Sequence, residues 1–219
     1  MATTWEKRPG IHVFAPHDDA QGECVLAQVL AAQPWRRDIE WPVGFEAGIV
    51  HRLDGSTSGA LLIADDLQEL AKFRAWFSSG LWQKSYVMLA ARDVPWCHHR
   101  CKTPIGHARR RKGRMVVQRG RNTPHRGQWM EADTEFFRVD GSLFRVVIRT
   151  GVMHQIRVHS AFVGLPLLGD GRYGGGSTPE QAPPGVTFFL HHVGMKGPDG
   201  CQTEPVTTPG WASAFQARL

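Results

Sequence analysis

The sequence lacks the apolar run of about 20 residues that a membrane-spanning helix requires. Its first residues, MATTWEKRPGIHVFAPHDD, also lack the apolar stretch of a secretory signal. We therefore expect a cytoplasmic protein without a membrane partner. With 219 residues, of which 42% are hydrophobic, the chain can build one sizeable core.

Cysteine is scarce, and its spacing gives no disulfide framework. The four cysteines are Cys24, Cys97, Cys101 and Cys201. Only Cys97 and Cys101 lie close together, which fits a reducing compartment. The stretch CHHRC (97–101) and His107 offer possible zinc ligands, but the paired CxxC knuckles of structural zinc sites are missing. The prediction is that the chain holds no metal.

Two common catalytic signatures are also missing. The chain has no G-x-S-x-G elbow for a serine nucleophile. The stretch GDGRYGGG (169–176) has many glycines, but it lacks the strand–GxGxxG–helix context of a dinucleotide site and the Gly-Lys-Ser/Thr of a phosphate-binding loop. A turn is the better interpretation of this stretch.

Acidic residues are absent from residues 100–126, where ten of the 26 Lys and Arg residues fall. The rest of the chain therefore has more acidic than basic residues. Such a segment predicts a polyanionic partner, and nucleic acid is favoured. A solvated basic loop or an arm that binds a protein is the alternative. Because of their mutual repulsion, Arg109, Arg110 and Arg111 with Lys112 and Arg114 are expected to form a mobile segment.

Hydrophobic periodicity predicts a mixture of helices and strands. Helices are expected at 24–33, 65–80, 154–164 and 209–219. Strands are expected at 10–14, 60–64, 85–93, 134–151 (a hairpin turning at Asp140-Gly141) and 186–196. This order favours an α+β fold with a mostly antiparallel mixed β-sheet flanked by helices and loops. We expect a single domain over 1–219, with residues 174–185 and the basic segment as its flexible parts.

The stretch IVHRLDGSTSGALLIADD (49–66) places Asp54 on a loop of small residues between two hydrophobic runs. Together with KSYVMLA (84–90) and RTGVMHQIRVHSAFVGLPLLGDGRY (149–173), it resembles the RluA-type pseudouridine synthase family. That family has H-R-L-D followed by T-S-G, then Lys-x-Tyr on a strand, then H-Q-I-R-V-H followed by G-x-P-L-x-G-D. The matched blocks run in order from about residue 47 to about residue 195.

The resemblance has departures. The strand with Asn-Lys-Pro-x-Gly that often precedes the catalytic block is reduced to EKRPGIHVF (6–14), and Val152 stands where the family has Arg. Residues 1–45 are therefore divergent. Because too little chain precedes the core, no separate S4-like RNA-binding domain is expected.

The resemblance implies a pseudouridine synthase catalytic fold and an enzyme that isomerises uridine in ribosomal or transfer RNA. The isomerisation breaks the C1′–N1 bond and rejoins the uracil through C5, so no cofactor is needed. A carboxylate can stabilise the positive charge that develops on the sugar or attack it covalently. Asp54 is the candidate, either by addition to C1′ or by assisting loss of a C2′ proton.

The resemblance also assigns the other residues of the site. Arg157 is expected to pair with Asp54 and keep it ionised, although a surface ion pair is the plain alternative. Tyr86 is expected against the uracil ring, or else in the core. Arg52 is expected to fill the gap that the flipped base leaves. His154 and Gln155 of the third motif are further expected substrate-binding residues. Arg109, Arg110 and Arg111 are expected to bind the substrate because of the charge of the basic segment, not because of the resemblance.

An RNA uridine isomerase that acts as a monomer is thus the leading interpretation. The alternative is a non-catalytic RNA-binding protein that retains the scaffold. A buried carboxylate facing phosphates brings no advantage to a protein that only binds RNA, so the intact set of Asp54, Tyr86 and Arg157 favours the enzyme. The sequence assigns no chemistry to His51.

Overall fold

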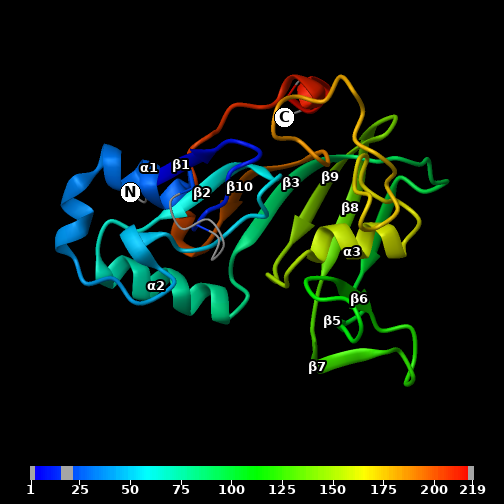
Figure 1. Cartoon of the computed structure of the whole chain (residues 1–219), viewed down its shortest axis with the longest axis horizontal. Coiled ribbons are helices and arrows are strands. Elements are labelled where there is room, and N and C mark those ends of the chain that lie inside the picture. Colours follow the sequence, from blue (N-terminus) through cyan, green and yellow to red (C-terminus); the bar gives the residue numbers. More distant parts are fainter. Residues whose placement is uncertain (1–2, 16–21, 217–219) are drawn as a thin grey trace. The chain divides into compact units, whose positions relative to one another are not determined.

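The computed structural model describes residues 3–15 and 22–216 (Figure 1). Its contacts divide the chain into two compact units. Unit 1 comprises Met1–Lys84, Pro183–Val186 and His191–Thr208, and unit 2 comprises Ser85–Ala182, Thr187–Leu190 and Pro209–Leu219. Each unit is built from helices and β-strands, and the predicted α+β class with mixed sheets is confirmed.

Unit 1 is built around strand β2 (Ser58–Ile63), which pairs on both sides. Strand β1 (Thr3–Lys7) runs antiparallel to it, and β10 (Leu190–Lys196) runs parallel to it. All of β2 from Gly59 onward is buried, which explains why it reads as a continuous apolar run rather than an alternating one. The helices of this unit are α1 (Val25–Ala32), α2 (Leu67–Ser78) and the short 3-10 turns Pro34–Asp38, Glu46–Gly48 and Pro198–Gly200.

Helix α2 begins where its sequence predicts. The Asp66 side chain accepts a hydrogen bond from the Glu69 backbone N–H at 2.7 Å, and Glu69 accepts one from the Asp65 backbone at 2.8 Å. These two bonds form a reciprocal cap. The apolar face of α2 then packs its buried Leu70 and Phe73 against the core of unit 1.

Unit 2 holds a second group of strands in the order β3-β9-β8-β4. They are β3 (Gln83–Leu89), β4 (His98–Cys101), β8 (Thr134–Asp140) and β9 (Leu143–Ile148). The predicted hairpin is β8–β9, and its turn uses Gly141 at φ 46°. Helix α3 (Gln155–Phe162) follows, and the tail carries the short turn Gly210–Ala212 and helix α4 (Ser213–Gln216).

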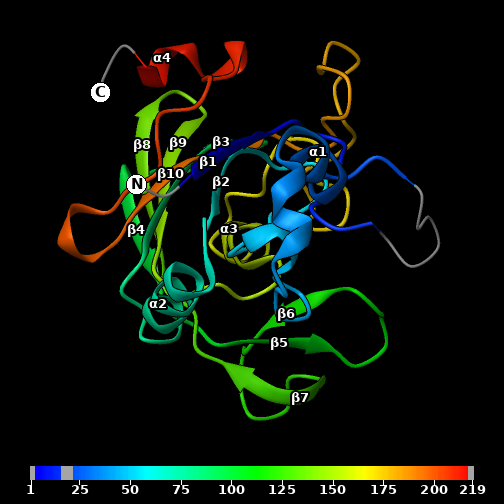
Figure 2. The same ribbon diagram turned by 90° about the vertical axis from the view of Figure 1, so that its left-hand side faces the viewer.

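A small antiparallel sheet in unit 2 has the order β6-β5-β7. Its strands are β5 (Ile105–Ala108), β6 (Met115–Val117) and β7 (His125–Met130). Figures 1 and 2 show α3 beside β6, where Met115 and Val117 pack against Val158 of the helix. The basic segment therefore forms part of a folded sheet.

The structure corrects two sequence predictions. The strand predicted at 10–14 is absent from the described chain, where this stretch makes only an isolated bridge between His12 and Cys24, and the strand lies earlier, at Thr3–Lys7. The basic segment is not a flexible arm, because β5, β6 and the start of β7 fall within it. The other predicted helices and strands are confirmed, with the last three residues of the predicted tail helix outside the described residues.

Candidate active site

Asp54 lies in unit 1 on the turn that leads into β2. It is half-buried and follows the buried Leu53, and its backbone carbonyl accepts a hydrogen bond from the Thr57 N–H at 3.0 Å. Thr57 itself is buried. The small residues after Asp54 therefore form a compact turn that presents the carboxylate at the start of a buried strand.

His51 fixes the approach to this turn. Its Nε2 accepts a hydrogen bond from the Leu62 backbone N–H at 3.1 Å, and its ring packs edge-on against His192 at 5.6 Å. Burial lowers the pKa of His51 well below its usual value, so the ring is neutral. These contacts give His51 a packing role that ties the HRLD block to β2.

Gly59 is required by the same packing. It adopts φ +116°, and a Cβ placed there would lie 2.1 Å from the backbone oxygen of His192 in the paired strand β10. Its neighbour Ser58 hydrogen-bonds through Oγ to Nδ1 of His191 at 2.9 Å. The Ser-Gly pair of the motif thus allows β10 to approach β2 closely.

Lys7 is a functional candidate that the sequence reasoning missed. It is buried, and its Nζ donates to the backbone oxygens of Gly55 and Thr57, both at 2.7 Å, and to that of Arg8 at 3.0 Å. Burial lowers the pKa of Lys7 to about 8, and the negative charge of Asp54 opposes this shift. Lys7 therefore holds the backbone that follows Asp54 in the turn and places a cation near its carboxylate. The signal was present in the degenerate stretch EKRPG, which contains this lysine.

Two further basic residues of the motifs also belong to unit 1. Arg52 is exposed, so its side chain is accessible to a large partner. Lys84 is buried, its Nζ lies 5.2 Å from the centre of the Phe77 ring, and burial lowers its pKa to about 8.

In unit 2, Tyr86 lies on β3 and is buried. The third motif forms helix α3, in which Gln155 and His159 face the same side because they are four residues apart. Gln155 donates through Nε2 to Oγ1 of Thr134 at 3.0 Å, and this hydroxyl also meets Nδ1 of His159 at 2.9 Å. Nε2 of His159 in turn meets the Thr103 backbone oxygen at 2.8 Å. This chain of hydrogen bonds fixes α3 to β8.

All hydrogen-bonding positions of the Gln155 amide have protein partners. Besides Thr134, Nε2 donates to the Asp133 backbone oxygen at 3.0 Å, and Oε1 accepts from Thr150 Oγ1 at 2.8 Å and from the Val152 N–H at 3.1 Å. This arrangement favours a supporting role for Gln155 over the direct substrate contact that the sequence analysis expected.

Arg157 projects from the opposite side of α3 and forms a buried ion pair with Asp170. Its Nε lies 2.7 Å from Oδ2 and its Nη2 lies 3.0 Å from Oδ1 of that carboxylate. The guanidinium also lies over the rings of Phe188, at 4.2 Å, and Tyr173, at 5.2 Å. The two parallel hydrogen bonds fix the plane of the guanidinium. Asp170 is thus a second residue that the sequence analysis left without a role.

His154 and Tyr173 connect α3 to the basic segment. His154 precedes the helix in a left-handed conformation, with φ 55°, and its Nδ1 lies 2.9 Å from the Tyr173 hydroxyl. The same hydroxyl accepts a hydrogen bond from the Met115 N–H of β6 at 2.9 Å. Burial raises the pKa of Tyr173, so it stays protonated near neutral pH.

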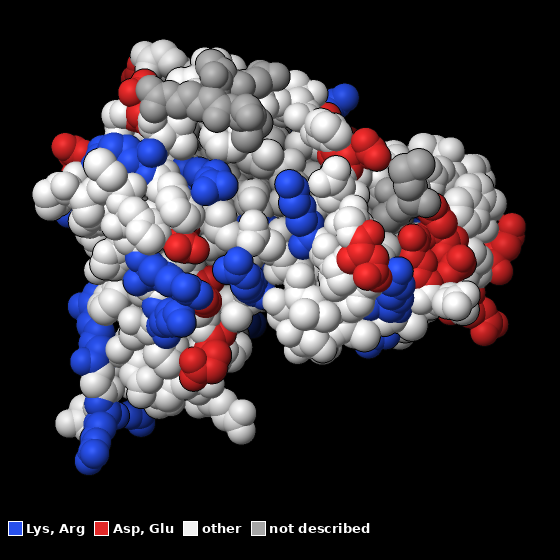
Figure 3. Space-filling view, turned by 180° about the vertical axis from the view of Figure 1, so that it is seen from behind, with Lys and Arg blue, Asp and Glu red and all other residues white. Residues whose placement is uncertain are grey.

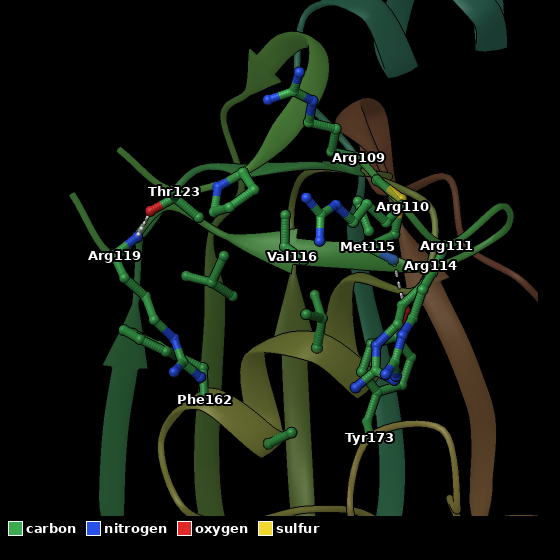
Figure 4. A pocket seen from close by; sticks show the side chains of 15 residues that line it. Arg109, Arg110, Arg111, Arg114, Met115, Val116, Arg119, Thr123, Phe162 and Tyr173 are labelled. Carbon is green, nitrogen blue, oxygen red and sulfur yellow. Dashed lines mark hydrogen bonds between the residues drawn. The ribbon is translucent and has the colours of Figure 1, made fainter. Parts of the chain in front are cut away.

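Arg109, Arg110 and Arg111 form the exposed β5–β6 turn. They line a cavity of about 720 Å³ in unit 2 (Figure 4). Figure 3 shows Lys and Arg gathered at the lower left, over this small sheet. The turn is therefore placed as a surface for a polyanion.

The predicted site residues thus fall into two sets. Asp54 and Arg52 belong to unit 1, together with Lys7, and the remaining predicted residues belong to unit 2. Within residues 3–15 and 22–216, no cluster of three or more His, Cys, Asp or Glu could hold a metal ion. No helix in the described part of the chain is long and apolar enough to cross a membrane.

Comparison with known proteins identifies the class to which this fold and these motifs belong. The family model described as RNA pseudouridylate synthase matches residues 5–162, well over half of the sequence, and the chain belongs to this family. The predicted family is confirmed.

Individual relatives share part of their length with this chain. It is 35% identical over 130 residues to "Ribosomal large subunit pseudouridine synthase D" of Pseudomonas aeruginosa, covering 59% of this chain and 39% of the relative. It is 33% identical over 132 residues to "RNA pseudouridine synthase 2, chloroplastic" of Arabidopsis thaliana, covering 58% and 31%. The chain therefore matches less than half the length of these relatives.

The fold is similar to that of solved structures. "Human RNA Pseudouridylate Synthase Domain Containing 4" superposes with a TM-score of 0.66 at 22% identity, covering 99% of this chain and 88% of that one. "Human RNA Pseudouridylate Synthase Domain Containing 1" gives the same score and identity, covering 95% and 83%. These likenesses establish a shared fold.

Proposed function

We propose that this chain isomerises specific uridines of structured RNA to pseudouridine and uses Asp54 as its catalytic carboxylate. The observation that carries the proposal is the built environment of Asp54. Its turn is held by two hydrogen bonds from one buried lysine, and His51 ties the preceding residues to β2. A surface turn that merely contained an aspartate would not need such support.

The reaction replaces one bond between sugar and base by another and leaves the atomic composition of the RNA unchanged. The C1′–N1 bond breaks, the uracil turns, a C1′–C5 bond forms, and the C5 proton is lost while N1 regains one. The carboxylate of Asp54 either adds to C1′ or assists loss of the C2′ proton while the sugar carries positive charge. Lys7 supports this role because its Nζ holds the backbone of the turn and its positive charge lies near the Asp54 carboxylate.

The target base leaves its stack to reach the carboxylate. Tyr86 lies against the uracil ring, and the exposed Arg52 occupies the space from which the base has moved. Arg157, with its plane fixed by Asp170, supplies a positive charge to the reaction. His154 and the arginines of the β5–β6 turn bind RNA phosphates, while Gln155 supports α3.

Ribosomal RNA and transfer RNA are the two candidate substrates. The printed name of the Pseudomonas aeruginosa relative, a ribosomal large subunit synthase, supports ribosomal RNA. Mapping of pseudouridine in total RNA with and without the gene would identify the RNA and the position.

The decisive test of the chemistry is Asp54→Asn. We expect this variant to lose pseudouridine formation under single-turnover conditions while its RNA affinity changes little, because an amide is nearly isosteric but is not a nucleophile. Asp199→Asn is the matched control, because Asp199 is exposed in unit 1 at φ 57°, a conformation that Asn also adopts readily. Activity of Asp54→Asn within tenfold of wild type would remove Asp54 from its role. Tight RNA binding by a wild type that forms no pseudouridine would favour the non-catalytic alternative.

A further inference from the structure

The cavity in unit 2 combines a basic rim with an apolar floor, and electrostatic attraction alone does not explain the floor. It lies between the β5–β6 turn and the last turns of α3, and Figure 4 shows β6 crossing it. Its floor is apolar, made by Val116 and Val117 of β6 and by Val158 and Ala161 of α3. Its volume, about 720 Å³, falls in the range of sites that enclose small organic groups.

Each end of the cavity carries an arginine over an aromatic ring. At one end, the Arg119 guanidinium lies 5.7 Å from the centre of the Phe162 ring, and at the other, Arg114 lies 5.3 Å from that of Tyr173 (Figure 4). The two ends differ in access, since Phe162 is 37% exposed and Tyr173 only 7%. The Phe162 end is therefore the more accessible of the two to a ligand.

The rim is strongly and uniformly positive. Five arginines line the cavity, and no Asp or Glu does: they are Arg109, Arg110, Arg111, Arg114 and Arg119. Among the described residues, none of the five forms an ion pair. The charge of these arginines is thus available to a ligand. A matching ligand carries negative charge where it meets the rim and a flat apolar group where it meets the floor.

We propose that this cavity binds one unpaired nucleotide of the RNA, with its base against Phe162 and Arg119 and its phosphates toward Arg109, Arg110 and Arg111. Aromatic rings and guanidinium planes stack on nucleobases, and arginines bind phosphates. The proposal rests on the proposed function for its ligand class, RNA. It goes beyond that function because the cavity is a second base-binding site, built entirely from unit 2 and separate from the uridine that reacts.

An acidic peptide is the competing ligand, and the floor argues against it. Carboxylate side chains would satisfy the arginines but would leave the exposed Phe162 and the valine floor without an apolar partner. A nucleotide satisfies both features at once, because it joins a planar base to a phosphate within one residue.

The test measures binding without turnover, in the Asp54→Asn background. The probes are a single-stranded oligouridine, a duplex RNA of the same length and polyglutamate, each titrated at several salt concentrations. The variants are Phe162→Ala, Phe162→Tyr to retain an aromatic ring, and Leu81→Ala as the matched control for loss of an exposed apolar side chain. Pseudouridine formation is measured separately with Asp54 intact.

We expect Phe162→Ala to weaken binding of the single strand about tenfold, the effect of losing one stacked base. The salt dependence should not change, since every arginine that binds a phosphate remains in place. Phe162→Tyr and Leu81→Ala should bind like wild type, and duplex affinity should be unaltered because its bases are not available for stacking.

Unchanged single-strand affinity of Phe162→Ala, or an equal loss on the duplex, would overturn the nucleotide site. So would a loss confined to polyglutamate, which would assign the cavity to an acidic protein. These outcomes do not depend on catalysis. A protein that binds as expected yet forms no pseudouridine would refute the proposed function and leave the cavity as a nucleotide site.

Discussion

Arg157 and Arg111 carry the same guanidinium group in the same unit, in opposite surroundings. Arg157 is 8% exposed and is held by the carboxylate of Asp170 through two hydrogen bonds. Arg111 is exposed on the β5–β6 turn, beside other arginines, and forms no ion pair among the described residues. The sequence places Arg157 in the third motif and Arg111 in the basic segment, but it does not show that one is buried and the other exposed.

These two surroundings give positive charge two different roles, one in the stability of the fold and one in binding RNA. A buried cation loses its hydration and must find partners within the fold, so its removal disturbs the fold. An exposed cluster keeps its hydration and contributes nothing to stability, so it is available to a polyanion, whose counterions it displaces. Stability and RNA affinity should therefore respond to different arginines, and the following predictions test this from the largest effect on folding to the smallest.

The buried pair should give the largest effect. Removing one partner of a buried ion pair typically costs about 3–5 kcal/mol, because the other charge is left without compensation. Arg157→Met and Asp170→Asn should each lower the free energy of unfolding by that order, as measured by urea titration. The double variant should lose less than the sum of the two, because the charges compensate each other.

The same variants test the proposed role of Arg157 in catalysis. Folded Arg157→Met should form pseudouridine slowly, because the reaction loses the positive charge that Arg157 supplies. A normal rate in this variant would leave Arg157 with a purely structural role.

The buried histidines of unit 1 should make the fold sensitive to acid. Burial lowers the pKa of His191 to about 4 and that of His192 to about 3, against a usual value of 6.5. Below pH 6.5 the two histidines bind protons in the unfolded chain but stay neutral in the folded protein. The free energy of unfolding is therefore highest above pH 6.5 and falls as the pH drops toward the pKa values of the folded protein. Each histidine should lower the free energy of unfolding by roughly 2 kcal/mol between pH 7 and pH 5.

Urea titrations at pH 7, 6 and 5 measure this loss. His191→Gln and His192→Gln should each flatten the dependence on pH, since an amide has no proton to take up. A free energy of unfolding that is constant over this range would show that these rings bind protons as readily in the folded protein as in the unfolded chain.

The sequence predicted the elements whose signals are local. Asp66 and the helical spacing of Leu70 and Phe73 mark α2, and Asp140-Gly141 marks the β8–β9 hairpin. Their stabilising contacts lie within a few residues, so the pattern is visible in a short window.

The strands β5 and β6 were not predicted because their support is distant. They have four and three residues, and the surrounding charges dominate the pattern. Their buried Ile105 and Met115 pack against Val158 and Tyr173, which follow much later in the chain. The role of Lys7 was not predicted for the same reason, because its carbonyl partners in the Asp54 turn are 48 and 50 residues away.

Lys7 should have a smaller effect on stability than the buried ion pair. Lys7→Met leaves the buried backbone oxygen of Thr57 without its lysine donor, while that of Gly55 still accepts a hydrogen bond from the Gly10 N–H. A buried group left unsatisfied costs about 1–3 kcal/mol. Lys84→Met is the matched control for stability, since the described residues give Lys84 an aromatic contact and no hydrogen bond. Urea titration should show the loss for Lys7 alone, and equal values for both variants would mean that the Asp54 turn does not depend on Lys7.

The exposed arginines should have the smallest effect on folding. Replacing Arg109, Arg110 and Arg111 with Gln should leave the free energy of unfolding unchanged or slightly higher, because like charges no longer repel. RNA affinity should fall on all sequences alike, since phosphate contacts carry little sequence information. The log–log dependence of affinity on salt should flatten by about 0.7 for each single-strand phosphate that the protein no longer neutralises. Gln at the exposed Arg37, Arg74 and Arg92 removes the same charge elsewhere and is the matched control.

The chemical step of the Arg109, Arg110 and Arg111 variant, measured at saturating RNA, should barely change, because this turn lies outside the three catalytic motifs. An equal loss of affinity in the control variant would mean that net charge rather than the turn attracts the RNA. An unchanged salt dependence with a collapsed single-turnover rate would break the division between buried and exposed cations. It would mean that these arginines help to position the reacting uridine, a role otherwise proposed for Tyr86 and Arg52.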